Sequence, residues 1–284
     1  MNWRTIGFEK QKRMFEALAV SGNLSRAYIF SGPEQIGKLT FARDLFVSLN
    51  KRRNFDANDP DWFMLAPKDT EKETKIYTED IRGLKNFLSL TPYYGPYKMA
   101  VIDDAHRLTP EASNALLKIL EEPTPSTIFV LISGQIQEIL PTVISRCEKV
   151  YFLPHADEIL RDLPELKKLN ETDRSVVAAI ARGRLGWALS AAAPENLEEI
   201  KKTIFDFQKI LGSPLAERML YVKSLFEKNS YRDSVDCWLA WAYINQAELP
   251  NSSRLLAGLL NLHRRLNQPQ YNHRALLENT LINL

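Results

Sequence analysis

The sequence contains few cysteines: only Cys147 and Cys237 occur among its 284 residues. Two cysteines form at most one bridge, and neither belongs to a Cys-x-x-Cys pair, which argues against a secreted disulfide-rich fold and against a zinc ribbon. The chain also lacks a run of about 18 apolar residues, the length that a membrane span needs, and residues 1–10 lack the apolar core of a signal peptide. We therefore expect a cytoplasmic protein without a membrane segment.

The chain also has little net charge. Its 37 basic and 35 acidic residues leave a formal charge of +2. Strong independent binding to DNA needs a large excess of Lys and Arg, because neutralised phosphates supply most of the non-specific affinity. Any contact with DNA is therefore expected to be local and directed at the backbone. The length exceeds that of one average domain and predicts two or three packed units.

The first half of the chain alternates short apolar runs with helical patterns, which is typical of an α/β unit with a mostly parallel sheet. Each predicted strand is short, apolar and bounded by polar or turn residues; the strands are 27–30, 99–102, 127–132 and 149–152. Helices are predicted at residues 39–49 and 110–121. The second has Thr109 as its cap, Pro110 in its first turn and Pro123 after its end.

The remaining segments predict how the chain divides into domains. Residues 50–74 are polar and charged, and we interpret them as a long surface excursion outside the sheet. After Pro154 the β-rich pattern ends and helical spacing continues. The predicted division is an α/β domain over residues 1–155, a small helical domain over 156–195 and an all-helical domain over 196–284.

A candidate phosphate-binding loop lies between the first strand and the next helix, at Ser31–Thr40. Gly32 and Gly37 permit the tight backbone path that directs amide groups at phosphate oxygens. Lys38 supplies a cation for the terminal phosphates. The alternative interpretation is an ordinary glycine-containing turn from a strand to a helix.

The loop lacks one functional group. A working loop carries Ser or Thr directly after the lysine to bind Mg²⁺, and here that position holds Leu39. Thr40 follows one residue later, and one helical residue turns a side chain by about 100°. Its hydroxyl is therefore expected to face elsewhere.

Two aspartates follow the second predicted strand. Asp103 stands where a carboxylate would bind the Mg²⁺ shell, and Asp104 where a longer glutamate normally polarises the attacking water. The shorter side chain predicts weak hydrolysis. The alternative is that both aspartates cap the next turn. His106 has no second ligand at metal-binding spacing, so we expect it to pack or form hydrogen bonds.

Three stretches resemble the clamp-loader branch of the AAA+ proteins: Ser31–Thr40, Val101–Pro123 and Leu140–Cys147. The resemblance implies a RecA-like AAA+ domain with helices on both faces of a parallel sheet, a small helical lid and an all-α carboxy-terminal collar. Within this branch, the Gly-Lys-x-Thr spacing and the Asp-Asp-Ala-His box resemble the delta-prime type. The ATP-hydrolysing gamma and tau subunits carry a hydroxyl directly after the lysine.

The same resemblance assigns roles to further residues. It implies that Arg146, in Ser-Arg-Cys, is an arginine finger for the ATP site of the next subunit; the alternative is an arginine that neutralises helix-end carbonyls or Glu148. Ser133 stands near the first sensor. The arginine of the second sensor falls on Gly186, while Arg184 is out of register and expected to be a solvated charge. We therefore expect little ATP turnover by the chain itself, and the sequence leaves binding of ATP or ADP open.

The resemblance also implies partners. It predicts a five-membered ring with delta and gamma or tau subunits, which opens the sliding clamp and places it on primed DNA. No cofactor and no zinc are expected, since residues 50–63 lack the four-cysteine module that the resemblance implies for many relatives. The contribution of that module is either dispensable here or supplied by packing of Trp62 and Phe63. Two other functions remain open: a self-sufficient AAA+ ATPase that uses Thr40 and Asp104, and a helical adaptor on an inert α/β scaffold.

Overall fold

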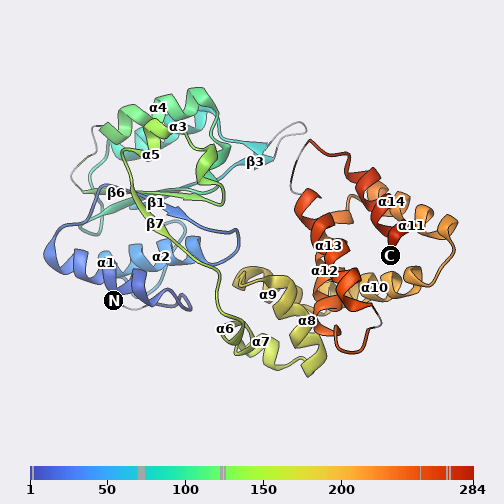
Figure 1. Cartoon of the computed structure of the whole chain (residues 1–284). Helices are drawn as coiled ribbons and strands as arrows, with labels where there is room; N and C mark the ends of the chain where they lie inside the picture. The colour runs from blue at the N-terminus through green and yellow to red at the C-terminus, as the bar shows by residue number, and fades with distance from the viewer. Residues whose placement is uncertain are drawn as a thin grey trace. The chain divides into compact units, whose positions relative to one another are not determined.

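The computed structural model describes residues 1, 3–69, 74–121, 124, 126–249, 251–266, 268 and 270–284. The chain divides into two compact units, Met1–His155 and Ala156–Leu284, which are described separately below (Figure 1). Pro123, the predicted stop of a helix, lies outside the described residues.

The first unit is a parallel sheet with helices on both faces, as the sequence predicts (Figure 1). Its strand order is β2-β5-β6-β1-β7, and each neighbouring pair is parallel. The strands are β1 (Ala27–Ser31), β2 (Trp62–Leu65), β5 (Lys98–Ile102), β6 (Thr127–Ser133) and β7 (Glu148–Tyr151), with a separate hairpin of β3 (Lys68–Asp69) and β4 (Thr74–Lys75). The helices are α1 (Glu9–Ser21), α2 (Lys38–Leu49), α3 (Thr78–Leu88), α4 (Pro110–Glu121) and α5 (Pro141–Ile144), with single turns η1 (Ala105–Arg107) and η2 (Ile136–Glu138).

The two helices predicted in this unit are confirmed. The predicted helix 39–49 differs from α2 by one residue, and 110–121 matches α4. The amide of Ala112 donates to Oγ1 of Thr109 at 3.2 Å, so this threonine caps α4 as its sequence predicts.

The prediction for residues 50–74 is wrong in part, because β2 belongs to the main sheet. It pairs with β5 in parallel, with Trp62 opposite Met99. Trp62 is buried, and its ring lies 5.3 Å from that of Phe46 and 4.8 Å from that of Phe55. The four residues of β2 lie in a polar segment, and so short a run has too weak a pattern to predict a strand. Pairing with β5 and burial of the Trp62 indole stabilise this strand.

A buried carboxylate also fastens this edge of the sheet. Asp61 is fully buried and accepts hydrogen bonds from the backbone amides of Tyr93 (2.5 Å), Tyr94 (2.8 Å) and Gly95 (3.2 Å). These amides belong to the turn that leads into β5, and Nη2 of Arg52 also lies 3.7 Å from Oδ2 of Asp61. The carboxylate therefore joins the start of β2 to the start of β5 through charge-assisted hydrogen bonds.

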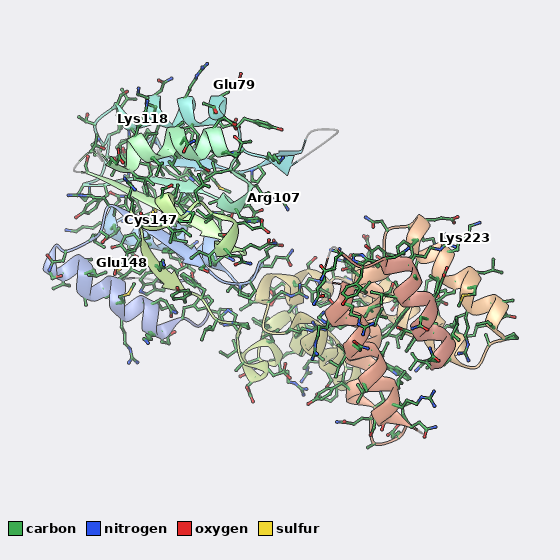
Figure 2. The ribbon with its side chains drawn as sticks, turned by 45° about the horizontal axis from the view of Figure 1, so that its top comes forward. Glu79, Arg107, Lys118, Cys147, Glu148 and Lys223 are labelled. Carbon is green, nitrogen blue, oxygen red and sulfur yellow. The ribbon has the colours of Figure 1, made fainter. Side chains whose placement is uncertain are left out.

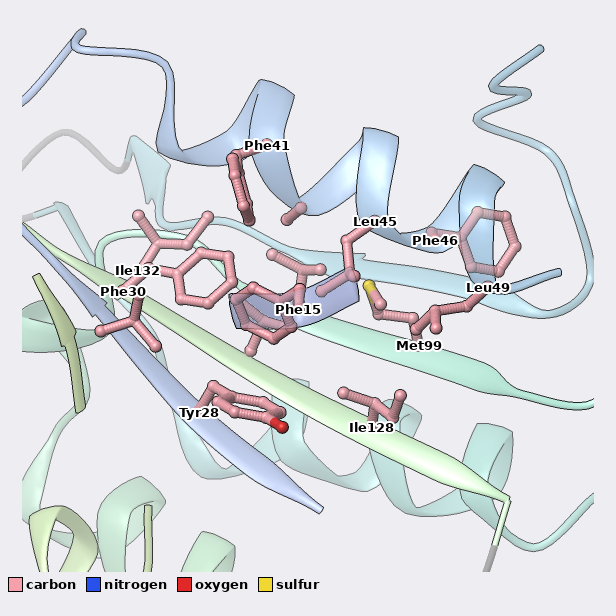
Figure 3. Packing of buried hydrophobic residues seen from close by; sticks show 14 of the residues in the cluster. Phe15, Tyr28, Phe30, Phe41, Leu45, Phe46, Leu49, Met99, Ile128 and Ile132 are labelled. Atoms are coloured by element: carbon pink, nitrogen blue, oxygen red, sulfur yellow. The ribbon is translucent and has the colours of Figure 1, made fainter. Parts of the chain in front are cut away.

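The side chains of β1 alternate between two cores, one on each face of the sheet. Tyr28 and Phe30 pack with α1 and α2, whereas Ile29 packs with α3 and α4. Figure 3 shows Phe15 of α1 and Phe41 of α2 among the aromatic rings of the first core. Burial on both faces explains why the sequence of β1 is apolar throughout.

All the regular secondary structure in the described part of the second unit is helical. Its helices are α6 (Asp157–Arg161), α7 (Pro164–Lys167), α8 (Glu171–Ala181), α9 (Leu185–Ala191), α10 (Pro194–Leu211), α11 (Leu215–Glu227), α12 (Tyr231–Ile244), α13 (Ser252–Leu266) and α14 (His273–Asn283). One apolar core joins α6–α9 to parts of α10 and α12, and a second fills α10–α14, where Phe207 stacks on Trp238 with ring centroids 4.4 Å apart. The predicted division between residues 195 and 196 stays a prediction. Within the described part of the chain, no helix is long and apolar enough to cross a membrane.

Candidate functional site

The carboxyl ends of β1, β5 and β6 meet at one edge of the sheet. Ser31 lies opposite Ser133, and the amide of Gly32 donates to the carbonyl oxygen of Ser133 at 3.2 Å. On the other side of β6, Ile102 lies opposite Leu131, so the residues after β5 emerge at the same edge. The structure thus brings together the candidate phosphate loop, the two aspartates and Ser133. In open parallel sheets, ligands bind beyond this edge.

Two glycines allow the backbone path of the loop. A Cβ atom on Gly32 would lie 2.1 Å from the carbonyl oxygen of Phe152, closer than any side chain fits. Gly37 has φ of 107°, which residues with a side chain rarely adopt. Both positions therefore need glycine for the backbone alone.

The side chain of Lys38 is hydrogen-bonded to the backbone of the loop that precedes it. Its side chain is buried, and Nζ donates to the carbonyl oxygens of Gly32 at 2.6 Å and Pro33 at 2.5 Å. Burial lowers the pKa of Lys38 from its ordinary value, while nearby carboxylates, Asp103 foremost, oppose that change. The ammonium group would have to exchange these carbonyl contacts for a phosphate.

The two residues after Lys38 lie as the helical spacing predicts. Leu39 is half-buried against the aromatic core, and Thr40 is exposed. The position next to the lysine thus offers no oxygen ligand. The residues present do not fit the magnesium site of an active phosphate loop.

Asp103 and Asp104 lie side by side after β5. Burial raises the pKa of Asp103, the neighbouring Asp104 raises it further, and the amide of Asp104 donates to Oδ1 of Asp103 at 3.1 Å. Asp104 has a left-handed backbone, with φ of 47°, at the start of η1. Its side chain makes no capping hydrogen bond to that turn, so the alternative of a capping role finds no support for Asp104.

Asp104 belongs to a cluster of possible metal ligands that the sequence analysis did not predict. One ligand atom each of Glu34, Asp104 and His106 lies within 4.8 Å of the other two. Ser133 is fully buried, and its Oγ lies 3.5 Å from Nδ1 of His106, in line with the hydrogen-bonding role expected for that histidine. Sequence spacing alone could not reveal the group, because Glu34 comes from the loop after β1 and the other two residues follow β5.

Arg146 projects from a different part of this unit, after α5. Its side chain is 36% exposed; Nη2 lies 2.5 Å from Oε1 of Glu121, and Nη1 donates to the carbonyl oxygen of Thr142 at 3.0 Å. The carbonyl contact agrees with the alternative interpretation of this arginine. Its acidic neighbour is not Glu148, however, which accepts a hydrogen bond from Ser25 at 2.7 Å. Figure 2 labels Cys147 and Glu148, the two residues that follow Arg146.

Comparison with known proteins identifies the family. A family model described as "DNA polymerase III, delta subunit" matches residues 7–156. DNA polymerase III subunit delta' of Pseudomonas aeruginosa is 30% identical over 236 residues, which cover 73% of this chain and 69% of that protein. The chain belongs to the delta-prime family of DNA polymerase III subunits.

Other relatives are less completely covered. Subunit delta' of Bacillus subtilis is 32% identical over 57% of this chain, which spans only 53% of that protein. The gamma/tau subunit of Mycobacterium tuberculosis is 33% identical over 44% of this chain and 24% of its own length. A gamma subunit-related protein of Thermotoga maritima shares the fold, with a TM-score of 0.54 and 19% identity over 95% of this chain and 97% of that one.

In this member of the delta-prime family, the segment expected to resemble a second sensor uses its arginine to bind the end of the preceding helix. Gly186 lies in the first turn of α9 and offers no cation. Arg184 is not the solvated charge that we expected. Its Nε donates to the carbonyl oxygen of Ala181 at 3.0 Å and its Nη2 to that of Ile180 at 3.2 Å. The guanidinium thus neutralises the end of α8, where a cation is stabilising.

Proposed function

We propose that this delta-prime family member works in the clamp loader of DNA polymerase III mainly by serving a neighbour, with Arg146 as an arginine finger in trans. The observation that supports this role is the position of Arg146 on the surface of the first unit, held by one exposed carboxylate and one carbonyl. A guanidinium placed beside a transferred phosphoryl group neutralises the charge that develops on it. Arg146→Ala should therefore reduce ATP turnover by the neighbouring subunit.

The chain's own nucleotide site supports a role without hydrolysis. Leu39 offers no oxygen to Mg²⁺, and Asp104 is one methylene shorter than the glutamate of active subunits. The self-sufficient ATPase would require Thr40 to bind the metal, and its exposed position one residue further along argues against that. The first test is the purified chain alone. The proposal predicts negligible ATP hydrolysis; turnover of about one per second, lost in Lys38→Ala, would contradict it.

Nucleotide binding is a separate property from hydrolysis. Lys38 and the loop keep the residue types of an anion site, so we propose that ATP or ADP binds when Nζ exchanges its carbonyl partners for phosphate. Because the magnesium ligand after Lys38 is missing, we predict that any affinity for ATP changes little when Mg²⁺ is removed with a chelator. Calorimetric titration with and without Mg²⁺ measures this. A strong requirement for Mg²⁺ would show that another oxygen replaces the missing hydroxyl.

The partners follow from the family. Relatives bear the names of delta', gamma and tau subunits of DNA polymerase III, and we propose that this chain joins delta and gamma or tau subunits in a five-membered ring in the cytoplasm. The ring would load a sliding clamp on primed DNA. The net charge of +2 favours DNA contacts that are shared around the ring. Native mass spectrometry of the mixed subunits tests the stoichiometry.

A further inference from the structure

We propose that Glu121 is the resting partner of Arg146, and that the neighbour's phosphate must displace Glu121 before Arg146 acts. This inference rests on the proposed role of Arg146 as a finger. The contact joins two elements that the sequence separates by 25 residues: Glu121 is the last residue of α4, and Arg146 follows α5. We call the two side chains the resting pair.

The local electrostatics indicate why the two side chains meet. Glu121 ends a helix of 12 residues, where the helix dipole disfavours a negative charge. The Arg146 guanidinium neutralises that carboxylate from 2.5 Å and also binds the carbonyl oxygen of Thr142. Both ends of the arginine fork are therefore occupied on its own subunit.

The same pairing opposes the proposed chemistry. A finger stabilises a transferring phosphoryl group through its positive charge, and a carboxylate in contact with the guanidinium cancels much of that charge. Glu121 must therefore move away, or be replaced by phosphate oxygens, when the finger is engaged. The terminal phosphate has more negative charge and more acceptor oxygens than one carboxylate, so it competes well for Nη1 and Nη2.

The exposure of the pair makes the exchange feasible. The Glu121 side chain is 50% exposed and that of Arg146 is 36% exposed. A surface ion pair of this kind shifts the equilibrium between paired and separated side chains by a factor of up to about five. Glu121 is thus a positioning residue of moderate strength: it keeps Arg146 on the surface of its own subunit while the neighbour lacks ATP, yet yields when ATP is bound.

The test uses Glu121→Gln in a loader reconstituted from this chain, delta, gamma or tau, the clamp and primed DNA. The amide keeps the shape of the side chain and removes the charge. We expect maximal DNA-stimulated ATP turnover to rise about two- to fivefold at low salt. The gain should shrink toward none as salt screens the pair, which a purely structural effect of the substitution would not do. Glu111→Gln, at an exposed position on the same helix, is the matched control and should leave turnover unchanged.

Combination with Arg146→Ala separates this inference from the proposed function. If the resting pair explains the gain, Glu121→Gln raises turnover only in chains that keep Arg146. Turnover at or below that of the unaltered chain, or an equal gain in the Arg146→Ala background, overturns the resting pair. If Arg146→Ala alone leaves turnover unchanged, the finger itself is wrong, which is a distinct result.

Discussion

At the scale of single residues, Asp103 is a partly buried carboxylate beside a second carboxylate, and this environment bears on the stability of the fold. Burial and Asp104 raise its pKa above the unfolded value. The folded chain therefore binds a proton more readily than the unfolded chain, and stability falls as the pH rises from the unfolded pKa through the folded one. Asp103→Asn removes this partly buried charge. We predict a higher Tm than that of the unaltered chain at pH 7, with the difference shrinking below about pH 4.

Thermal unfolding followed by circular dichroism at several pH values measures this difference. Asp56→Asn is a suitable control, because Asp56 is exposed and an asparagine keeps the acceptor for the amide of Asn58. A lower Tm for Asp103→Asn at pH 7 would mean that attraction to Lys38 outweighs the burial of the carboxylate.

Gly32 gives a second prediction at this scale. Gly32→Ala forces a methyl group against the carbonyl oxygen of Phe152, so the loop or the segment after β7 must shift. We expect a loss of about 1–3 kcal/mol in the free energy of unfolding, measured by urea denaturation. Gly83→Ala, within α3 and with its nearest neighbour atom 3.9 Å away, should instead stabilise the chain by about 0.5–1 kcal/mol. Equal effects of the two substitutions would contradict the close approach at Gly32.

At the scale of elements, Asp61 holds the edge of the sheet by joining the start of β2 to the turn before β5. Asp61→Ala leaves three backbone amides without their carboxylate acceptor. Hydrogen bonds to a charged group contribute about 1.5–3 kcal/mol each, although water can replace part of that. We predict that the substitution lowers the free energy of unfolding by about 2–3 kcal/mol. It should accelerate amide exchange in β2 and β5 more than in β1. Uniform acceleration across the sheet would contradict a local role.

The elements also show what the sequence could and could not predict. The apolar runs of β1, β5 and β6 and the Thr109 cap of α4 are local signals, and each can be predicted from a few adjacent residues. The edge strand β2 cannot, because it depends on pairing with Met99 and on amides more than thirty residues away from Asp61.

The residues of the candidate site could likewise be predicted from the sequence only in part. Lys38, Leu39 and Thr40 form a contiguous motif whose geometry follows from helical spacing. The Glu34, Asp104 and His106 group and the resting pair each join segments that only the tertiary fold brings together. Such contacts leave no periodic or short-range pattern in the sequence.

At the scale of the whole molecule, the two functions weighed for the first unit make opposite demands. An autonomous ATPase needs Lys38, a magnesium ligand and a water-polarising carboxylate in one chain, whereas a subunit that serves its neighbour needs an accessible Arg146. Leu39 stands where the magnesium ligand of an autonomous ATPase is required. The exposed position of Arg146 meets the requirement of a subunit that serves its neighbour.

The most direct test of this account is the ATP turnover of a reconstituted loader that contains Arg146→Ala. Removal of an arginine finger typically costs about 10³-fold or more at the site that it serves. We predict that DNA-stimulated turnover falls because that site is lost, while the mass of the assembled ring and the turnover with Arg53→Ala, an exposed control, stay unchanged. Unchanged turnover in an intact ring that contains Arg146→Ala would contradict the central claim.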